Sequence, residues 1–129
     1  MLHLYDIDPS CEAVANVLNR TQLDAGRFQF RVSDIMARDY CVIASEGCAP
    51  DLIINTSCEH LVDFAAWYEL VPAGQLLALQ SNDYYAIPEH VNCSATLADF
   101  AAQAPMNERL YEGALALPKY TRFMLIGRK

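Results

Sequence analysis

Residues 2–10 of the chain, LHLYDIDPS, decide how the fold begins. Leucine, tyrosine and isoleucine dominate residues 2–7, which favours a strand because bulky side chains pack well on a pleated surface. Two aspartates follow at its end. Pro9 and Ser10 then open a helix, since proline suits a first helical turn and serine suits an N-cap. The chain is therefore expected to start with a strand that leads directly into a helix.

The next two segments continue this alternation. Val14, Val17 and Leu18 give the expected helix an apolar face, and Gly26 follows its end. The segment RFQFRVSDI, residues 27–35, alternates apolar and polar side chains, which is typical of a half-buried strand. Together these segments predict a strand–helix–strand unit.

The remainder of the chain continues the alternation of strands and helices and ends in a pair of strands. Further strands are expected at 52–55 and 75–83, helices at 61–71 and 94–104, and a strand pair around Pro118 within 110–128. Alternating strands and helices predict an α/β fold, with a mostly parallel sheet flanked by helices. The final strand pair is expected to be antiparallel. No repeat or linker interrupts the pattern, so residues 1–129 are expected to form a single domain.

Composition excludes several classes of protein. Hydrophobic residues make up 53% and charged residues 19% of the 129 residues, as in a globular domain. The net charge of −7 argues against a nucleic-acid or membrane partner. No apolar run approaches the ~20 residues that cross a bilayer. The acids near the N-terminus interrupt any signal peptide, and five scattered cysteines suit a reducing compartment. We therefore expect a cytoplasmic protein.

Polar residues gather where the predicted strands end. Asp6, Asp34, residues 55–60 and residues 80–83 each follow an apolar strand. In open parallel sheets, ligands bind beyond the carboxyl ends of the strands. This edge of the sheet is therefore the expected binding site.

At this point the sequence resembles the class I S-adenosylmethionine-dependent methyltransferases, which have a Rossmann-like fold. LYDIDP resembles their second strand, whose acid holds the ribose hydroxyls, a role that would fall on Asp6. RVSDI resembles the third strand, so Asp34 and Ile35 would hold the adenine. DLIINTS is similar to the fourth strand, which would place Asn55 against cofactor and substrate. The resemblance implies S-adenosylmethionine as cofactor.

The resemblance extends over nearly the whole chain but lacks its beginning. VPAGQLLALQS is similar to the family's fifth strand, and residues 110–128 resemble its sixth and seventh strands. The family's first strand and glycine-rich turn have no counterpart, because no glycine precedes Gly26. The chain is thus expected to be a truncated domain that starts at the second strand. Unpaired strand edges would favour a homo-oligomer.

Two short segments, SCEHLVDF (57–64) and PEHVNCSA (88–95), echo one another and follow successive strands. They predict a substrate site with His60 or His90 as general base, since a neutral imidazole accepts protons near pH 7. Glu59 is the third expected catalytic residue, and it would orient a polar acceptor. The expected substrate-binding residues are Asn82, Asp83, Tyr84 and Tyr85; Tyr111 and Tyr120 could also line the pocket, but sheet packing is the simpler explanation for them.

Three alternatives remain open at this stage. Cys58, His60, His90 and Cys93 would form a Cys2His2 metal site if the four groups converged. The same histidines and cysteines would otherwise cap helices and pack in the core. The whole chain would then be a non-catalytic binding or assembly module. The expected partner is a small-molecule acceptor, and the acidic balance gives no support to a nucleic acid.

Overall fold

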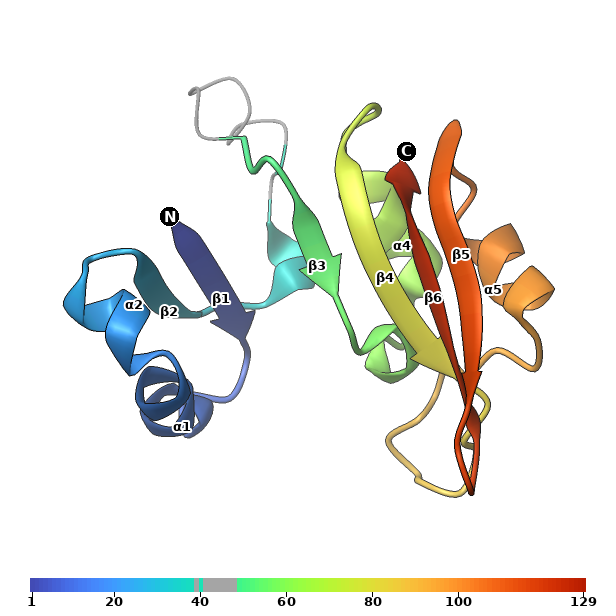
Figure 1. The fold of residues 1–129 in the computed structure, drawn as a ribbon, viewed down its shortest axis with the longest axis horizontal. Helices are drawn as coiled ribbons and strands as arrows, with labels where there is room; N and C mark the ends of the chain where they lie inside the picture. Colours follow the sequence, from blue (N-terminus) through green and yellow to red (C-terminus); the bar gives the residue numbers. More distant parts are fainter. Residues whose placement is uncertain (39, 41–48) are drawn as a thin grey trace. The chain divides into compact units, whose positions relative to one another are not determined.

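The computed structural model describes residues 1–38, 40 and 49–129 of the chain. These residues form two compact units, Met1–Arg38 and Asp39–Lys129, each with its own sheet (Figure 1). Each unit is described by itself below. The expectation of a single domain stays a prediction.

The N-terminal unit is built on two parallel strands. Its elements are β1 (Leu2–Asp6), α1 (Cys11–Leu18), α2 (Arg20–Asp24), β2 (Phe28–Val32) and the 3₁₀ helix η1 (Ile35–Ala37). β1 pairs with β2 over five residues, from Leu2 opposite Phe28 to Asp6 opposite Val32. The expected strand–helix–strand unit is therefore present, with its helical part divided in two.

Local hydrogen bonds explain where the helices of this unit begin and end. The prediction that Ser10 caps α1 is wrong: Ser10 has helical backbone angles and makes no side-chain cap bond. Asp8 Oδ1 accepts from the Ser10 N–H at 2.8 Å, and the Cys11 N–H donates to the Asp8 carbonyl, so the turn that leads into α1 begins before Ser10. After α2, Gly26 adopts φ +66°, a left-handed conformation that glycine enters without strain.

The core of the N-terminal unit is small. Ala15, Phe28 and Phe30 are buried, and Cys11 and Leu23 pack against them. The helix α1 does not bury the apolar face that was expected to cover the sheet. The residues of that face, Val14, Val17 and Leu18, are exposed. A two-stranded sheet offers α1 only a narrow surface, and the small side chain of Ala15 is enough to pack against it.

The C-terminal unit holds the larger sheet. Its elements are β3 (Ile53–Asn55), the 3₁₀ helix η2 (Cys58–His60), α4 (Phe64–Leu70), β4 (Leu76–Asn82), α5 (Leu97–Gln103), β5 (Glu108–Ala116) and β6 (Thr121–Arg128). The strand order is β3-β4-β6-β5. β3 and β4 are parallel, whereas β6 is antiparallel to both β4 and β5.

The core of this unit lies between the sheet and two helices. Leu77 and Leu79 of β4 are fully buried, and Leu79 pairs with buried Leu125 of β6. Phe64 of α4 and Phe100 of α5 have ring centroids 6.4 Å apart, so both helices cover the same face (Figure 1). Burying a leucine or phenylalanine side chain contributes about 1.5–3 kcal/mol each. This packed layer fixes the carboxyl end of β4.

The α/β class, with mixed sheets flanked by helices, is confirmed. The C-terminal strand pair is antiparallel as expected, and the parallel strands occur as two separate pairs. The three cysteines that the structure describes, Cys11, Cys58 and Cys93, are free. No helix within the described residues is long and apolar enough to cross a membrane. The cytoplasmic location stays a prediction.

Candidate functional site

A pocket of about 390 Å³ lies at the carboxyl ends of β3 and β4. The two strands are parallel, so the segments that follow them start from the same edge of the sheet. η2 follows β3 and contributes Glu59 and His60, while the loop after β4 contributes His90. The expected catalytic residues therefore line one pocket.

The two Glu-His segments are tied together by backbone and side-chain hydrogen bonds. The Asn92 N–H donates to the Glu59 carbonyl at 2.9 Å, and Asn92 Nδ2 donates to the Cys58 carbonyl at 3.3 Å. The rings of His60 and His90 meet edge to face, with centroids 4.6 Å apart. Residues thirty positions apart in the chain are thus in direct contact.

Both histidines are oriented through the same ring nitrogen. His60 Nδ1 lies 3.1 Å from the Glu89 carbonyl oxygen, and His90 Nδ1 lies 2.7 Å from the Tyr84 carbonyl oxygen. A carbonyl only accepts, so each Nδ1 carries the hydrogen. In the neutral ring Nε2 then keeps its lone pair, which is free to bind a proton or a metal ion.

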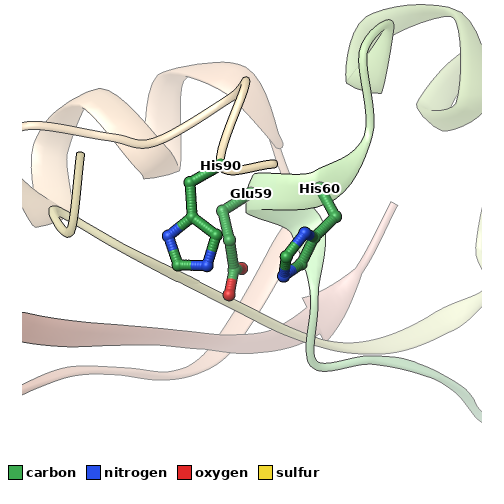
Figure 2. Close-up of side chains that lie close together, drawn as sticks. All are labelled: Glu59, His60 and His90. Carbon is green, nitrogen blue, oxygen red and sulfur yellow. The ribbon is translucent and has the colours of Figure 1, made fainter. Parts of the chain in front are cut away.

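Glu59 is the least exposed of the three residues. Its side chain points between the two imidazole rings (Figure 2), and the residue is only 3% exposed. Oε1 accepts from Asn82 Nδ2 at 2.7 Å, whereas Oε2 is buried without a hydrogen-bond partner in the described part of the chain. One ligand atom from each of Glu59, His60 and His90 lies within 4.8 Å of the others.

The cysteines of the expected Cys2His2 site do not join this group, so that ligand set is corrected. Burial and the Glu59 carboxylate raise the pKa of Cys58 far above its usual range, and its Sγ donates to the Asn55 carbonyl. Burial and the same carboxylate raise the pKa of Cys93, whose Sγ lies 3.4 Å from the Tyr84 carbonyl oxygen. Among the described residues, neither cysteine belongs to the group of close ligand atoms that Glu59, His60 and His90 form.

The expected substrate-binding residues separate into two kinds. Asn82 and Tyr84 line the pocket. Asp83 accepts from the Thr121 N–H at 2.6 Å, which ties the end of β4 to the start of β6. Tyr85 is 62% exposed and is not part of the pocket lining.

Several lining residues were missed by the sequence analysis. Arg122 of β6 lies opposite Asn82 in the sheet, and its guanidinium donates to Gln80 Oε1 at 3.0 Å. Tyr120, assigned to sheet packing, also lines the pocket, with its ring centroid 5.4 Å from that of Tyr84. The pairing register of β6 brings these residues in, and no local pattern encodes it. Thr56 and Ser57 follow β3 directly, and the polar run after that strand was a signal for them.

The expected cofactor residues are divided between the two units. In the N-terminal unit, Asp6 and Asp34 follow neighbouring parallel strands, and the Ser33 N–H donates to the Asp6 carbonyl at 2.9 Å. Asp34 also caps η1 by accepting from the Met36 N–H, and Ile35 is half-buried.

Asn55, the fourth expected cofactor residue, belongs to the C-terminal unit. Its Oδ1 accepts from the Ser57 N–H at 3.0 Å. Its Nδ2 is buried and unbonded within the described residues. Asn55 precedes the pocket-lining Thr56 and is not itself part of the pocket lining.

A larger hollow of about 610 Å³ lies near the amino end of β4. Asp51 and Arg128 are the charged residues among the described side chains that line it, and histidine and cysteine are absent from that lining. The clustered titratable groups therefore favour the smaller pocket as the functional site.

Comparison with known proteins gives matches to solved structures only. No family model matches the chain, and no curated protein matches it. The N-methyltransferase NodS from Bradyrhizobium japonicum WM9 is similar with a TM-score of 0.65 at 10% identity, covering 99% of this chain and 72% of that one.

Two further structures are similar over about half of their own length. An O-methyltransferase family protein from Burkholderia thailandensis has a TM-score of 0.53 at 16% identity, covering 97% of this chain and 43% of that chain. A possible exported protein from Bordetella parapertussis has a TM-score of 0.60 at 15% identity, covering 100% and 54%. At these identities the likeness shows the fold, which is methyltransferase-like.

Proposed function

We propose that this chain is an S-adenosylmethionine-dependent methyltransferase domain that acts on a small molecule. The observation that carries the proposal is the pocket at the carboxyl ends of β3 and β4, on a methyltransferase-like scaffold. Ligand sites of open α/β sheets lie at this edge. A pocket of about 390 Å³ suits a small acceptor, and the net charge of −7 disfavours a nucleic acid.

The acceptor would be deprotonated and aligned by the histidine pair. Each Nδ1 is held by a carbonyl oxygen, which leaves Nε2 as the atom that takes a proton from an acceptor hydroxyl or amine. Tyr84, Tyr120 and Arg122 line the same pocket and supply aromatic and cationic contacts. Alignment of acceptor and donor is the main requirement of a group transfer of this kind.

The residues of the N-terminal unit fit the nucleoside half of the cofactor, which supplies the methyl group when bound. Asp6 and Asp34 lie at the ends of paired strands, so both carboxylates are at one edge of β1 and β2. A carboxylate accepts from two adjacent hydroxyls, as a ribose requires.

Calorimetric titration with S-adenosylhomocysteine tests the cofactor site. The chelator-treated chain is expected to bind it with micromolar affinity, and Asp6→Ala to weaken binding at least about tenfold, because a charged hydrogen bond contributes about 1.5–3 kcal/mol. Asp24→Ala is the matched control, since Asp24 is an exposed acid of the same unit that ends α2.

The outcomes are distinct. Binding that Asp6→Ala weakens and Asp24→Ala preserves supports the proposal. Absence of heat at millimolar ligand, or equal loss in both variants, would contradict it. The methyltransferase-like fold would then describe the scaffold without its chemistry.

Self-association through strand edges belongs to the same proposal. Within the described residues, β1 pairs only with β2 and β3 only with β4. Strands with one unpaired edge are templates for pairing with another chain. Analytical ultracentrifugation is expected to show a dimer or larger species, and a monomer at all concentrations would reject this part of the proposal.

A further inference from the structure

We propose that Glu59, His60 and His90 form a binding site for a divalent first-row transition-metal ion, with Zn²⁺ as the reference ion. The ligands are Glu59 Oε2 and the two histidine Nε2 atoms. The proposal rests on the geometry of these side chains, and it concerns a metal-bound state in which the two Nε2 atoms are ligands instead of proton acceptors.

The three side chains are already close enough for one ion. One ligand atom of each lies within 4.8 Å of the others, and all three residues line the same pocket. Zinc bonds to nitrogen and oxygen are about 2.0–2.2 Å long, so two ligands of a tetrahedral ion are about 3.4 Å apart. The ligand atoms need to approach by up to about 1.5 Å, which side-chain rotation supplies.

The surroundings of the histidines have the form found around metal sites. Metal-bound histidines usually donate their other ring N–H to a carbonyl or carboxylate, which fixes the ring and its tautomer. Here His60 Nδ1 donates to the Glu89 carbonyl and His90 Nδ1 donates to the Tyr84 carbonyl. Both Nε2 atoms are therefore left as ligands, and the rings flank the Glu59 carboxylate (Figure 2).

The unpartnered oxygen of Glu59 is the second, independent observation. The residue is 3% exposed, and Asn82 satisfies only Oε1. Oε2 has no partner in the described ranges 1–38 and 49–129. A buried anionic oxygen without a partner is costly, and a cation between the two rings removes that cost.

The donor set defines the class of ion. Two imidazole nitrogens and one carboxylate suit Zn²⁺, Co²⁺, Ni²⁺ or Fe²⁺, whereas Mg²⁺ and Ca²⁺ prefer oxygen ligands only. Three protein ligands leave at least one coordination position open. That position opens into the pocket, where Arg122 and Tyr84 are within the lining. A water molecule or a heteroatom of a small acceptor would occupy it.

Zinc titration of the chelator-stripped chain tests the site. Calorimetry with ZnCl₂ is expected to give one site per chain with a Kd of about 1 μM or lower. Glu59→Gln, which keeps an oxygen for Asn82 but removes the charge, is expected to weaken binding at least about tenfold, as are His60→Ala and His90→Ala. Co²⁺ provides a second readout, because its visible absorption reports the coordination number.

Two controls separate the ligands from their neighbours. His3→Ala removes the third histidine of the chain, in the N-terminal unit, and is expected to leave Zn²⁺ affinity unchanged. Cys93→Ser removes a sulfur beside the pocket and is also expected to preserve binding. Loss of binding in Cys93→Ser equal to that in His90→Ala would overturn the proposed ligand set in favour of a cysteine-containing one.

The remaining outcomes also decide the question. Absence of saturable binding at millimolar Zn²⁺, or equal affinity of His60→Ala, His90→Ala and His3→Ala, overturns the proposal. Circular dichroism identifies any variant that fails to fold, and the exposed His60 keeps the test valid if Glu59→Gln does not fold. S-adenosylhomocysteine binding is measured on metal-free protein, so the two proposals fail separately.

Discussion

The two compact units of the chain differ sharply in what they bury. The N-terminal unit has a two-stranded sheet and a core of Ala15, Phe28 and Phe30. The C-terminal unit has a four-stranded sheet with two helices on one face. Its fully buried large apolar side chains are Trp67, Phe100, Leu77, Leu79, Leu125 and Val71.

This difference shows that sheet size limits how much an amphipathic helix buries. A two-stranded sheet is marginally stable by itself, because it offers few side chains to a covering helix. Val14 and Leu18 of α1 are accordingly exposed. In the C-terminal unit, α5 packs on β5 and β6, and the rings of Phe64 and Phe100 join α4 to α5. We infer that this unit holds most of the stability and gives the candidate site its rigid base.

The largest expected effect is a core substitution in the C-terminal unit. Leu79→Ala removes a fully buried side chain of β4 and is expected to lower the free energy of unfolding by about 2–5 kcal/mol. Leu110→Ala, on β5 at 56% exposure, is the control and should change it by under about 0.5 kcal/mol. Urea denaturation measures the free energy of unfolding of both variants. Equal losses would contradict the inference that the buried core of the C-terminal unit provides most of the stability.

Amide hydrogen exchange compares the units directly. Amides of β4 and β6 are expected to exchange at least about tenfold more slowly than those of β1 and β2, because local opening requires less free energy where few apolar contacts exist. Exchange measured by mass spectrometry or NMR tests this expectation. Equal protection of β1 and β4 would show that the two units unfold together.

Asn82→Ala tests how much the hydrogen bonds of Asn82 at the candidate site contribute to stability. It removes the hydrogen bond to Glu59 Oε1 and the one that Asn82 Oδ1 accepts from the Tyr84 N–H, which leaves both Glu59 oxygens without a partner among the described residues. The expected cost is about 1–3 kcal/mol of unfolding free energy. Asn107→Ala, an exposed asparagine before β5, serves as the control. An unchanged free energy of unfolding in Asn82→Ala would mean that Glu59 has another hydrogen-bond partner.

The smallest expected effect depends on pH. Tyr68 donates its hydroxyl to the Pro105 carbonyl at 2.7 Å, and burial raises its pKa above the usual value of 10.0, with a further contribution from Glu69. The folded state therefore holds this proton more tightly than the unfolded state. The stability from it is complete below pH 10 and is lost as the pH rises through the raised pKa.

Tyr68→Phe isolates this contribution. At pH 8 the variant is expected to lose about 0.5–1.5 kcal/mol of unfolding free energy, the usual contribution of one hydrogen bond. Its stability should then fall less steeply than that of the unmodified chain as the pH rises above 10.0. Urea denaturation across this range provides the measurement, and parallel pH profiles would refute the assignment.

Much of the fold was predictable because its signals are local. Alternation over Phe28–Val32 and the apolar residues of Leu76–Asn82 correctly predicted strands, since side-chain period and composition depend on the residues themselves. The two helices of the C-terminal unit were predicted for the same reason. The Ser10 cap was wrong because the turn begins at Asp8 and holds Ser10 in a helical conformation, in which its side chain makes no cap bond.

The candidate site was predictable in part. Glu59, His60 and His90 were identified because both segments follow successive strands, which places them at one edge of a parallel sheet. Arg122 and Tyr120 were not, because the antiparallel register of β6 depends on packing along its whole length. The cysteines were indistinguishable from ligands in the sequence, whereas in the structure both thiols contact backbone carbonyl groups and lie outside the group of Glu59, His60 and His90.

The sequence by itself determined the alternation of strands and helices, the acidic surface charge and the pair of Glu-His segments. These depend on residue type and spacing, which tertiary contacts do not alter. Tertiary structure decided that the two imidazole rings meet around the Glu59 carboxylate, that one of its oxygens stays unpartnered, and that the thiols turn to backbone carbonyls. Such choices depend on distances between residues far apart in the chain, which only the packed sheet and its loops set.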